Sequence, residues 1–196
     1  MIIDQRKARG ARARRVITRH AVDVASVEGL SGLSFGRLAT DLELSKGGVA
    51  TLFPTKEHLQ LATVETARGI FMEAVVQPAS DAPAGTARLR ALVERWISYA
   101  ELPLFAGGCF WAANLPDFDS RPGPVRDGLR RQRQAWLAVL AEQVFHAVGA
   151  GEIPEVDAEL TAFQIDAVLT AANLAMRLGE LDAADRVRRV IDGLLT

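Results

Sequence analysis

Residues 34–52 read SFGRLATDLELSKGGVATL and form the most informative stretch of the chain. The pattern predicts two short helices joined by a turn, with Ser34 and Ser45 placed to cap them, because a serine hydroxyl accepts hydrogen bonds from the first free N–H groups. Such a pair can present its second helix to the major groove of DNA. An ordinary helical hairpin fits the same pattern, so the pattern alone favours DNA binding only slightly. Small or apolar residues pack the pair: Leu38, Ala39, Leu42, Leu44, Val49 and Leu52.

The second of these helices contains two adjacent glycines. Lys46, Gly47, Gly48 and Thr51 are expected on or near its exposed N-terminal half. Each glycine costs a helix roughly 1 kcal/mol relative to alanine. A sequence that tolerates this cost indicates a helix whose backbone must approach another surface closely, and the edge of a DNA groove is such a surface.

Helical periodicity extends on both sides of this pair, and no stretch alternates as a strand would. Upstream, residues 9–28 carry one apolar stripe of a helix. Downstream, Thr55 is placed to cap a long helix that ends near Pro78. The stretch PASDAPAG, residues 78–85, has the composition of a linker.

Further helices are expected beyond the linker. One ends at Pro103, one begins at Pro124, one is capped by Asp157 and one starts at Asp182. The intervening residues 105–125 consist of a short aromatic stretch and then a loop rich in proline, aspartate and glycine. We therefore predict an all-α fold of about nine helices. Residues 1–60 would form a three-helix, helix-turn-helix domain, and residues 61–196 a helical C-terminal domain.

Composition limits the class of protein. The chain has 196 residues, 49% hydrophobic and 24% charged, which excludes a disordered or collagen-like chain. The single cysteine, Cys109, cannot form an intramolecular disulfide and so indicates a reducing compartment. Apolar runs end well short of the ~20 residues that a membrane-spanning helix needs. Arginines occupy the place where a signal peptide requires apolar residues, so we expect a cytoplasmic protein without a membrane partner.

A formal net charge of -1 conceals an uneven distribution. Residues 1–60 hold ten basic and six acidic side chains, whereas the rest of the chain holds 13 basic and 18 acidic ones. This segregation favours a small module for a polyanion joined to a larger body with another task. A solvated helix face or a frayed basic tail explains the charge equally well.

The stretch LSFGRLATDLELSKGGVATLFPTKEHL, residues 33–59, resembles the DNA-binding domain of the tetracycline-repressor (TetR) family of bacterial transcription regulators. Its part from Ser45 to Leu59 is far more specific for that family than a generic helix-turn-helix. A basic three-helix module followed by a larger helical body also fits the family. Beyond residue 65 the resemblance concerns architecture only, and it does not identify a ligand.

The resemblance implies roles for individual residues. Ser34 caps a helix and reaches a backbone phosphate, Lys46–Leu52 form the recognition helix, and Lys56 contacts phosphate at the start of the next helix. Two positions depart from the family: an aromatic is replaced by Ala50, and a turn glycine by Glu43. Four arginines near the N-terminus could compensate, as an N-terminal arm or as a phosphate clamp: Arg9, Arg12, Arg14 and Arg15. The residues assigned to DNA are Ser34, Ser45, Lys46, Gly47, Gly48, Thr51, Lys56, Arg12 and Arg15.

The last two helices are expected to form a homodimer. By resemblance they pair with their copies in a four-helix bundle, which places two recognition helices about one DNA turn, ~34 Å, apart. The same apolar stripes also fit a purely intramolecular core. The dimer residues are Leu160, Phe163, Ala167, Ala171, Val187, Val190, Ile191 and Leu194.

Aromatic and amide residues in the C-terminal part are candidates for a ligand pocket, since such pockets have apolar walls with a few polar groups. Plain core is the commoner role of such residues, and Asn173 fits either a pocket or a buried pair across the dimer. Charged residues are scarce on these stretches, which favours a small apolar effector. The candidates are Trp96, Phe105, Cys109, Phe110, Trp111, Asn114, Trp136, Asn173 and Met176.

Enzyme chemistry has little support in the sequence. The three histidines lie far apart and show no metal-ligand spacing, and Cys109 has no basic neighbour to activate it. We therefore expect no catalytic residue, no metal and no cofactor. The main hypothesis is a homodimeric repressor of double-stranded operator DNA that a small apolar effector releases. The alternative is a helical small-molecule-binding protein of the same fold that has lost operator binding, as Glu43 and Ala50 would suggest.

Overall fold

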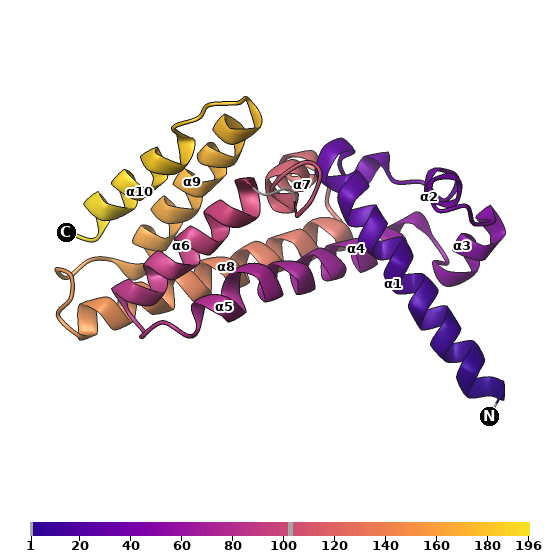
Figure 1. Ribbon diagram of the computed structural model, residues 1–196, viewed down its shortest axis with the longest axis horizontal. Helices are drawn as coiled ribbons and strands as arrows, with labels where there is room; N and C mark the ends of the chain where they lie inside the picture. The colour runs from indigo at the N-terminus through magenta and orange to yellow at the C-terminus, as the bar shows by residue number, and fades with distance from the viewer. Residues whose placement is uncertain (1, 102–103) are drawn as a thin grey trace. The chain divides into compact units, whose positions relative to one another are not determined.

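The computed structural model describes residues 2–101 and 104–196, and in this part of the chain every regular element is a helix (Figure 1). Helix α4 (Lys56–Phe71) continues through a π-helical turn (Met72–Val76) into α5 (Gln77–Ala79). With these three counted as one element, the described residues form nine helices besides one short 3-10 turn. The predicted all-α fold is confirmed.

The chain divides into two compact units that differ from a simple N-terminal and C-terminal split. Unit 1 comprises Met1–Gly69 and Phe105–Leu129, and unit 2 comprises Ile70–Leu104 and Arg130–Thr196. Residues 105–129 are therefore part of the same unit as the helix-turn-helix segment. The domain boundary at residue 60 stays a prediction.

Unit 1 is built around α1 (Ile2–Glu28), on which α2 (Phe35–Asp41), α3 (Lys46–Leu52) and α7 (Phe110–Phe118) pack. Its core is apolar and fully buried, with Ile17, Leu30, Leu38, Val49, Phe53, Leu59, Phe105 and Phe110 as members.

The helix starts in unit 1 follow the capping residues that the sequence indicates. The Ser34 hydroxyl accepts a hydrogen bond from the Arg37 N–H at 3.1 Å, and Ser45 accepts one from the Gly48 N–H at 3.0 Å. At the start of α4, Thr55 Oγ1 accepts from the His58 N–H at 3.2 Å. These bonds satisfy donors that the first turn of a helix leaves free.

The loop expected over residues 115–125 begins later than predicted. Helix α7 runs from Phe110 to Phe118 and includes Pro116. Asn114, fully buried in α7, anchors this helix to α1 and to the 3-10 turn that follows it (Leu30–Gly32): its side chain accepts from the Leu30 N–H at 2.6 Å and donates to the Ala25 carbonyl at 3.1 Å. Contacts distant in sequence thus stabilise a helix that its local composition does not favour.

Gly107 allows the chain before α7 to lie directly on α1. Its N–H donates to Ser26 Oγ at 2.8 Å. A Cβ atom at this position would lie 1.8 Å from the Ser26 carbonyl oxygen, so no other residue fits without moving the backbone.

Unit 2 contains α6 (Thr86–Glu101), most of α8 (Pro124–Gly149), α9 (Ala158–Arg177) and α10 (Ala183–Leu194). The last two lie side by side and both pack on α6 (Figure 1). Asp157 caps α9 as predicted, accepting from the Glu159 and Leu160 N–H groups at 3.0 Å. The end expected for α6 at Pro103 lies outside the described residues.

Candidate nucleic-acid interface

Helix α3 is attached to unit 1 by one face and exposes the other. Val49 is fully buried, whereas Lys46, Gly47, Gly48 and Thr51 are exposed. A Cβ added to Gly47 would have no heavy atom within 4 Å, so packing within the chain does not explain this glycine. Four of the predicted DNA contacts are therefore exposed on α3, and at Gly47 no side chain crowds the surface.

The turn between α2 and α3 has the geometry of a tight helix-turn-helix. Leu44 donates its N–H to the Ala39 carbonyl at 2.8 Å, which brings the two helices together at the small Ala39. Glu43 has φ 55, a left-handed conformation that L-residues other than glycine adopt at a cost. The exposed Glu43 thus occupies a position where backbone geometry favours glycine.

Lys56 lies at the N-terminus of α4, where the helix dipole favours anions. Its Nζ donates to the Ser31 carbonyl at 2.6 Å, and the side chain is exposed. One of the three ammonium protons is used in this bond, so the others remain able to contact a phosphate.

The arginines of α1 fall into different environments. The side chains of Arg12 and Arg15 are exposed and form no hydrogen bond or ion pair within the described chain. Arg19 pairs with Asp23 at 3.0 Å. Arg14 instead donates to the Leu52 carbonyl at the end of α3, at 2.8 Å. The sequence did not reveal this contact, because the two residues lie 38 positions apart.

A polar network that sequence reasoning missed joins α1 to α2. His20 Nε2 and Asp41 Oδ2 lie 2.9 Å apart, and Arg37 Nε donates to the same Asp41 oxygen at 2.7 Å. These bonds, that from His20 first, hold the pKa of Asp41 below its ordinary value. Only the Arg37–Asp41 pair, at i and i+4 of one helix, had a local sequence signal.

Comparison with models of protein families identifies the family of this chain. The profile for the tetracyclin repressor-like C-terminal domain matches residues 85–191, more than half of the chain. The chain belongs to the TetR family of transcriptional regulators. Its helical fold is accordingly that of a DNA-binding transcription regulator.

Solved structures of TetR regulators share this fold over nearly the whole length. A TetR transcriptional regulator from Chloroflexus aurantiacus J-10-FL is 25% identical with a TM-score of 0.84, covering 96% of this chain and 94% of its own. A TetR-family regulator from Cytophaga hutchinsonii is 22% identical with a TM-score of 0.82, covering 95% and 94%. AibR, solved with isovaleryl coenzyme A and operator DNA, is 20% identical with a TM-score of 0.73, covering 93% and 97%. No curated protein matched the chain.

The nine candidate residues of a ligand pocket are distributed over both units. Phe105, Cys109, Phe110, Trp111 and Asn114 belong to unit 1, and Trp96, Trp136, Asn173 and Met176 to unit 2. The amide of Asn114 is engaged by α1, as described above. In unit 2, the rings of Trp136 and Phe71 pack edge to face, with 5.2 Å between their centroids. The pocket stays a prediction.

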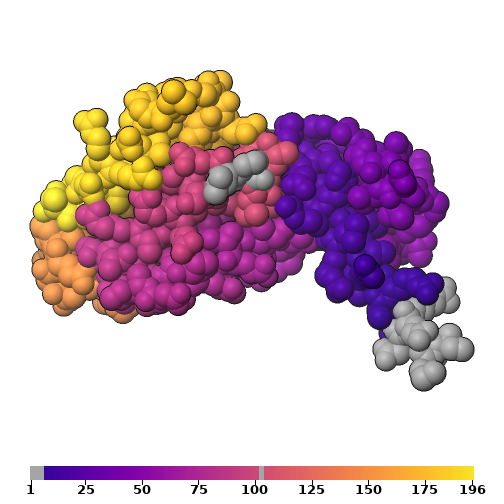
Figure 2. All heavy atoms as spheres, in the orientation of Figure 1, coloured from indigo at the N-terminus to yellow at the C-terminus, as the bar shows by residue number. Residues whose placement is uncertain are grey.

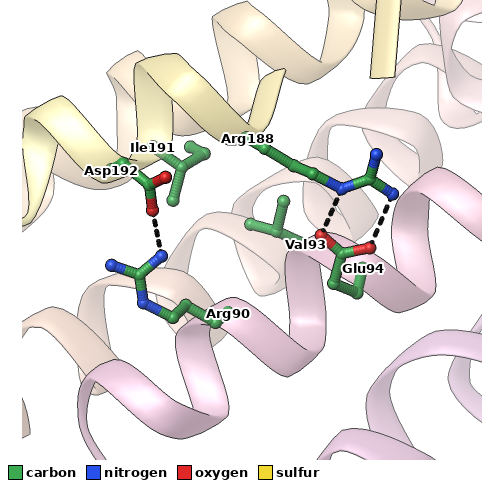
Figure 3. Close-up of a pocket in the computed structure, with 6 residues that line it drawn as sticks. All are labelled: Arg90, Val93, Glu94, Arg188, Ile191 and Asp192. Carbon is green, nitrogen blue, oxygen red and sulfur yellow. Dashed lines mark hydrogen bonds and ion pairs between the residues drawn. The ribbon is translucent and has the colours of Figure 1, made fainter. Parts of the chain in front are cut away.

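A groove of about 240 Å³ lies elsewhere in unit 2, between α6 and α10 (Figure 3). Val93 and Ile191 supply its apolar lining. Arg188 bridges the groove to both carboxylate oxygens of Glu94 at 2.8 and 2.9 Å, and Arg90 pairs with Asp192. The bonds to Glu94 and Asp185 raise the pKa of Arg188. These ion pairs join α10 to α6, and none of the predicted pocket residues lines the groove.

The predicted dimer residues separate into exposed and buried ones. On α9, Leu160 and Phe163 are 55% and 51% exposed, and Ala167 and Ala171 are exposed too. On α10, Val190 is exposed and Leu194 half-buried. Val187 and Ile191 are already buried within one chain. Helices α9 and α10 lie at the surface of unit 2 that Figure 2 shows in orange to yellow.

Residues 2–101 and 104–196 contain neither a metal-binding cluster nor a membrane span. No three His, Cys, Asp or Glu side chains of this part gather as a metal site would require. None of its helices combines the length and the apolar character needed to cross a membrane.

Proposed function

We propose that this TetR-family protein binds a palindromic operator as a homodimer, represses transcription there and is released by a small apolar effector. One observation carries the proposal: α3 is held by the buried Val49 and exposes Lys46, Gly47, Gly48 and Thr51. An open helix surface with little side-chain bulk allows close approach to base edges in a major groove. The remaining proposed contacts are Ser34, Ser45, Lys56, Arg12 and Arg15.

The charges around α3 support affinity for DNA. Lys56 lies at the N-terminus of α4, and Arg12 and Arg15 are exposed on α1. Contacts of such groups with phosphates release counterions, which makes binding dependent on salt and largely independent of sequence. Sequence preference then depends on what α3 presents to the bases.

The exposed stripe of α9 supports a homodimer. Leu160, Phe163, Ala167 and Ala171 follow one another at spacings of three and four, and all are exposed in a single chain. Exposed apolar stripes of this kind mark association surfaces. We assign the main part of the dimer interface to these residues with Val190 and Leu194, while Val187 and Ile191, buried already, add little further area.

Effector release is proposed by analogy with the family. AibR was solved with isovaleryl coenzyme A, and a regulator from Saccharomonospora viridis with choline. For this chain we propose a small apolar effector in the C-terminal domain, which acts by favouring a state whose α3 helices no longer fit successive major grooves. The protein would act in the cytoplasm, where the chromosomal operator lies, and no catalytic step is proposed.

The alternative, a small-molecule-binding protein of this fold without operator binding, is favoured by Glu43 and Ala50. Its carboxylate is exposed beside α3, where a negative charge weakens attraction to phosphates. Ala50 also removes an aromatic that the family resemblance implies.

Fluorescence anisotropy with DNA flanking the gene, against a shuffled duplex, tests the two functions. Operator binding predicts a specific, salt-sensitive complex that both Lys46→Ala and Lys56→Ala weaken. Arg95→Ala is the matched control, because it removes one positive charge from an exposed site of α6 in unit 2. A protein that binds both duplexes equally, or whose affinity the two lysine variants leave unchanged, would contradict the proposed function.

A further inference from the structure

Helix α3 is too short to be stable without contacts from other elements. It has seven residues, and isolated helices shorter than about 12–15 residues are marginal in water. Two of its seven residues are glycines, which lower helix stability further. Contacts from other elements must therefore hold it in a defined orientation.

The C-terminal end of α3 has a specific partner on α1. Arg14 Nη1 donates to the Leu52 carbonyl at 2.8 Å. The Arg14 guanidinium also lies over the ring of Phe53, with Cζ 4.6 Å from the ring centroid, and Phe53 is fully buried. One side chain thus contacts both the last residue of α3 and the aromatic residue that anchors the following turn.

This contact satisfies a need created by the helix end. The last carbonyls of a helix have no partner within it, and cations are favourable there because of the helix dipole. Phe53 closes α3 with a bond from its N–H to the Val49 carbonyl at 3.3 Å, and Arg14 supplies the donor for Leu52. Gly10, one turn earlier on α1, also brings the backbone of α1 close to the Leu52 side chain.

We propose that Arg14 is a positioning residue for the recognition helix: it fixes the end of α3 against α1 and thereby sets the specificity of DNA binding, while adding little to phosphate attraction. The proposal rests on the operator binding proposed above. Arg15, its neighbour, provides the contrast: both side chains are exposed, but that of Arg15 forms no hydrogen bond or ion pair within the described chain. Arg15 is thus available to a phosphate, whereas the guanidinium of Arg14 is engaged by α3.

The first measurement needs no DNA. Hydrogen–deuterium exchange of the free protein reports opening of residues 46–53, and removal of the hydrogen bond and the stacking on Phe53 should speed exchange there about fivefold in Arg14→Ala. Arg15→Ala should exchange as the wild type does. Circular dichroism monitors folding, and Arg14→Lys, which retains the charge but not the planar stacking, is the second variant.

The second measurement compares operator and shuffled DNA over a range of salt. Arg14→Ala should bind operator roughly 10- to 30-fold more weakly, because the dimer contains two copies of this arginine, and should bind shuffled DNA like the wild type. Its salt slope should stay that of the wild type, whereas Arg15→Ala should lower the slope by roughly 0.9 for each phosphate that the protein no longer neutralises. Arg14→Lys should regain only part of the operator affinity.

Each contrary result is distinct. Equal losses of affinity on both duplexes with a lower salt slope, or full recovery by Arg14→Lys, would make Arg14 a phosphate contact and overturn the inference. Unchanged exchange in residues 46–53 would overturn it as well. If the wild type showed no operator-specific complex, the proposed function would fall, and with it the role of Arg14 in specificity, while faster exchange would still show that Arg14 holds α3.

Discussion

Gly47→Ala separates the stability of α3 from its function. Gly47 lies within α3 and is absent from the glycines with positive φ, and an added Cβ would meet no atom within 4 Å. Alanine should therefore stabilise the helix by about 1 kcal/mol. The same methyl group would project from the exposed surface that we assign to the DNA groove, where it should obstruct close approach. The variant should thus be more stable and yet bind operator at least about tenfold more weakly, a difference of about 1.4 kcal/mol.

Urea unfolding and fluorescence anisotropy measure the two effects on the same samples. Gly69→Ala is the matched control: Gly69 lies near the end of α4, with the helical backbone continuing past it, and an added Cβ there also meets nothing within 4 Å. It should gain similar stability and leave operator affinity unchanged. Gly48→Ala is less suitable, because its Cβ would lie 3.0 Å from Ser45 Oγ and disturb the cap.

Two outcomes would refute this reasoning. If Gly47→Ala gained stability and bound operator as tightly as the wild type, the exposed face of α3 would not lie against the bases. If Gly47→Ala lost stability while Gly69→Ala gained it, the conclusion that an added Cβ at Gly47 meets no other atom would be wrong. Either result would remove the main support for the proposed contact surface.

Other sites give independent predictions. Glu43→Gly should stabilise the protein by about 1 kcal/mol in urea unfolding, since it relieves a left-handed glutamate, and should tighten operator binding; weaker binding would show that Glu43 assists DNA contact. Asn114→Ala should destabilise by about 2 kcal/mol because the Leu30 N–H stays buried without an acceptor, and a near-neutral effect would contradict that role. Phe163→Asp should yield monomers in light scattering, and a persisting dimer would place the interface elsewhere. The depressed pKa of Asp41 stabilises the fold at pH values above its unfolded pKa of about 3.9, so the Tm advantage over Asp41→Asn should vanish as pH falls below that value; a constant advantage would exclude the charge as its origin.

The features that the sequence predicted correctly are local ones. Ser34, Ser45 and Asp157 each bond to an N–H two or three residues ahead, so a capping residue and the pattern after it suffice. Residues 110–118 show the opposite case. A proline lies within this helix, and the bonds of Asn114 that hold it reach 84 and 89 positions back, beyond any local pattern.

The candidate interface likewise has features that the sequence could predict and one that it could not. Its residue types and their helix were predictable, because glycines and a lysine after a capping serine form one short motif. The sequence could not show which arginine of α1 bonds to α3 and which is left without a partner, since Arg14 and Arg15 are neighbours with the same side chain. Helical geometry turns successive residues by about 100°, and only the packing of α3 on α1 determines which of the two meets Leu52.

The packing of α3 on α1 bears on both requirements of selective DNA binding, which are attraction to phosphate and a fixed orientation of α3. A basic helix alone would attract any duplex, because phosphate contacts carry no sequence information. A glycine-containing α3 alone would present a surface that approaches bases closely but lacks a fixed orientation. In the binding mode that we propose, Arg14, which is bonded to α3, would give the orientation, and Arg15, whose side chain has no partner within the described chain, would attract phosphate. On the proposal that Arg14 positions α3, selective binding by so short a helix would depend on α1 as much as on α3 itself.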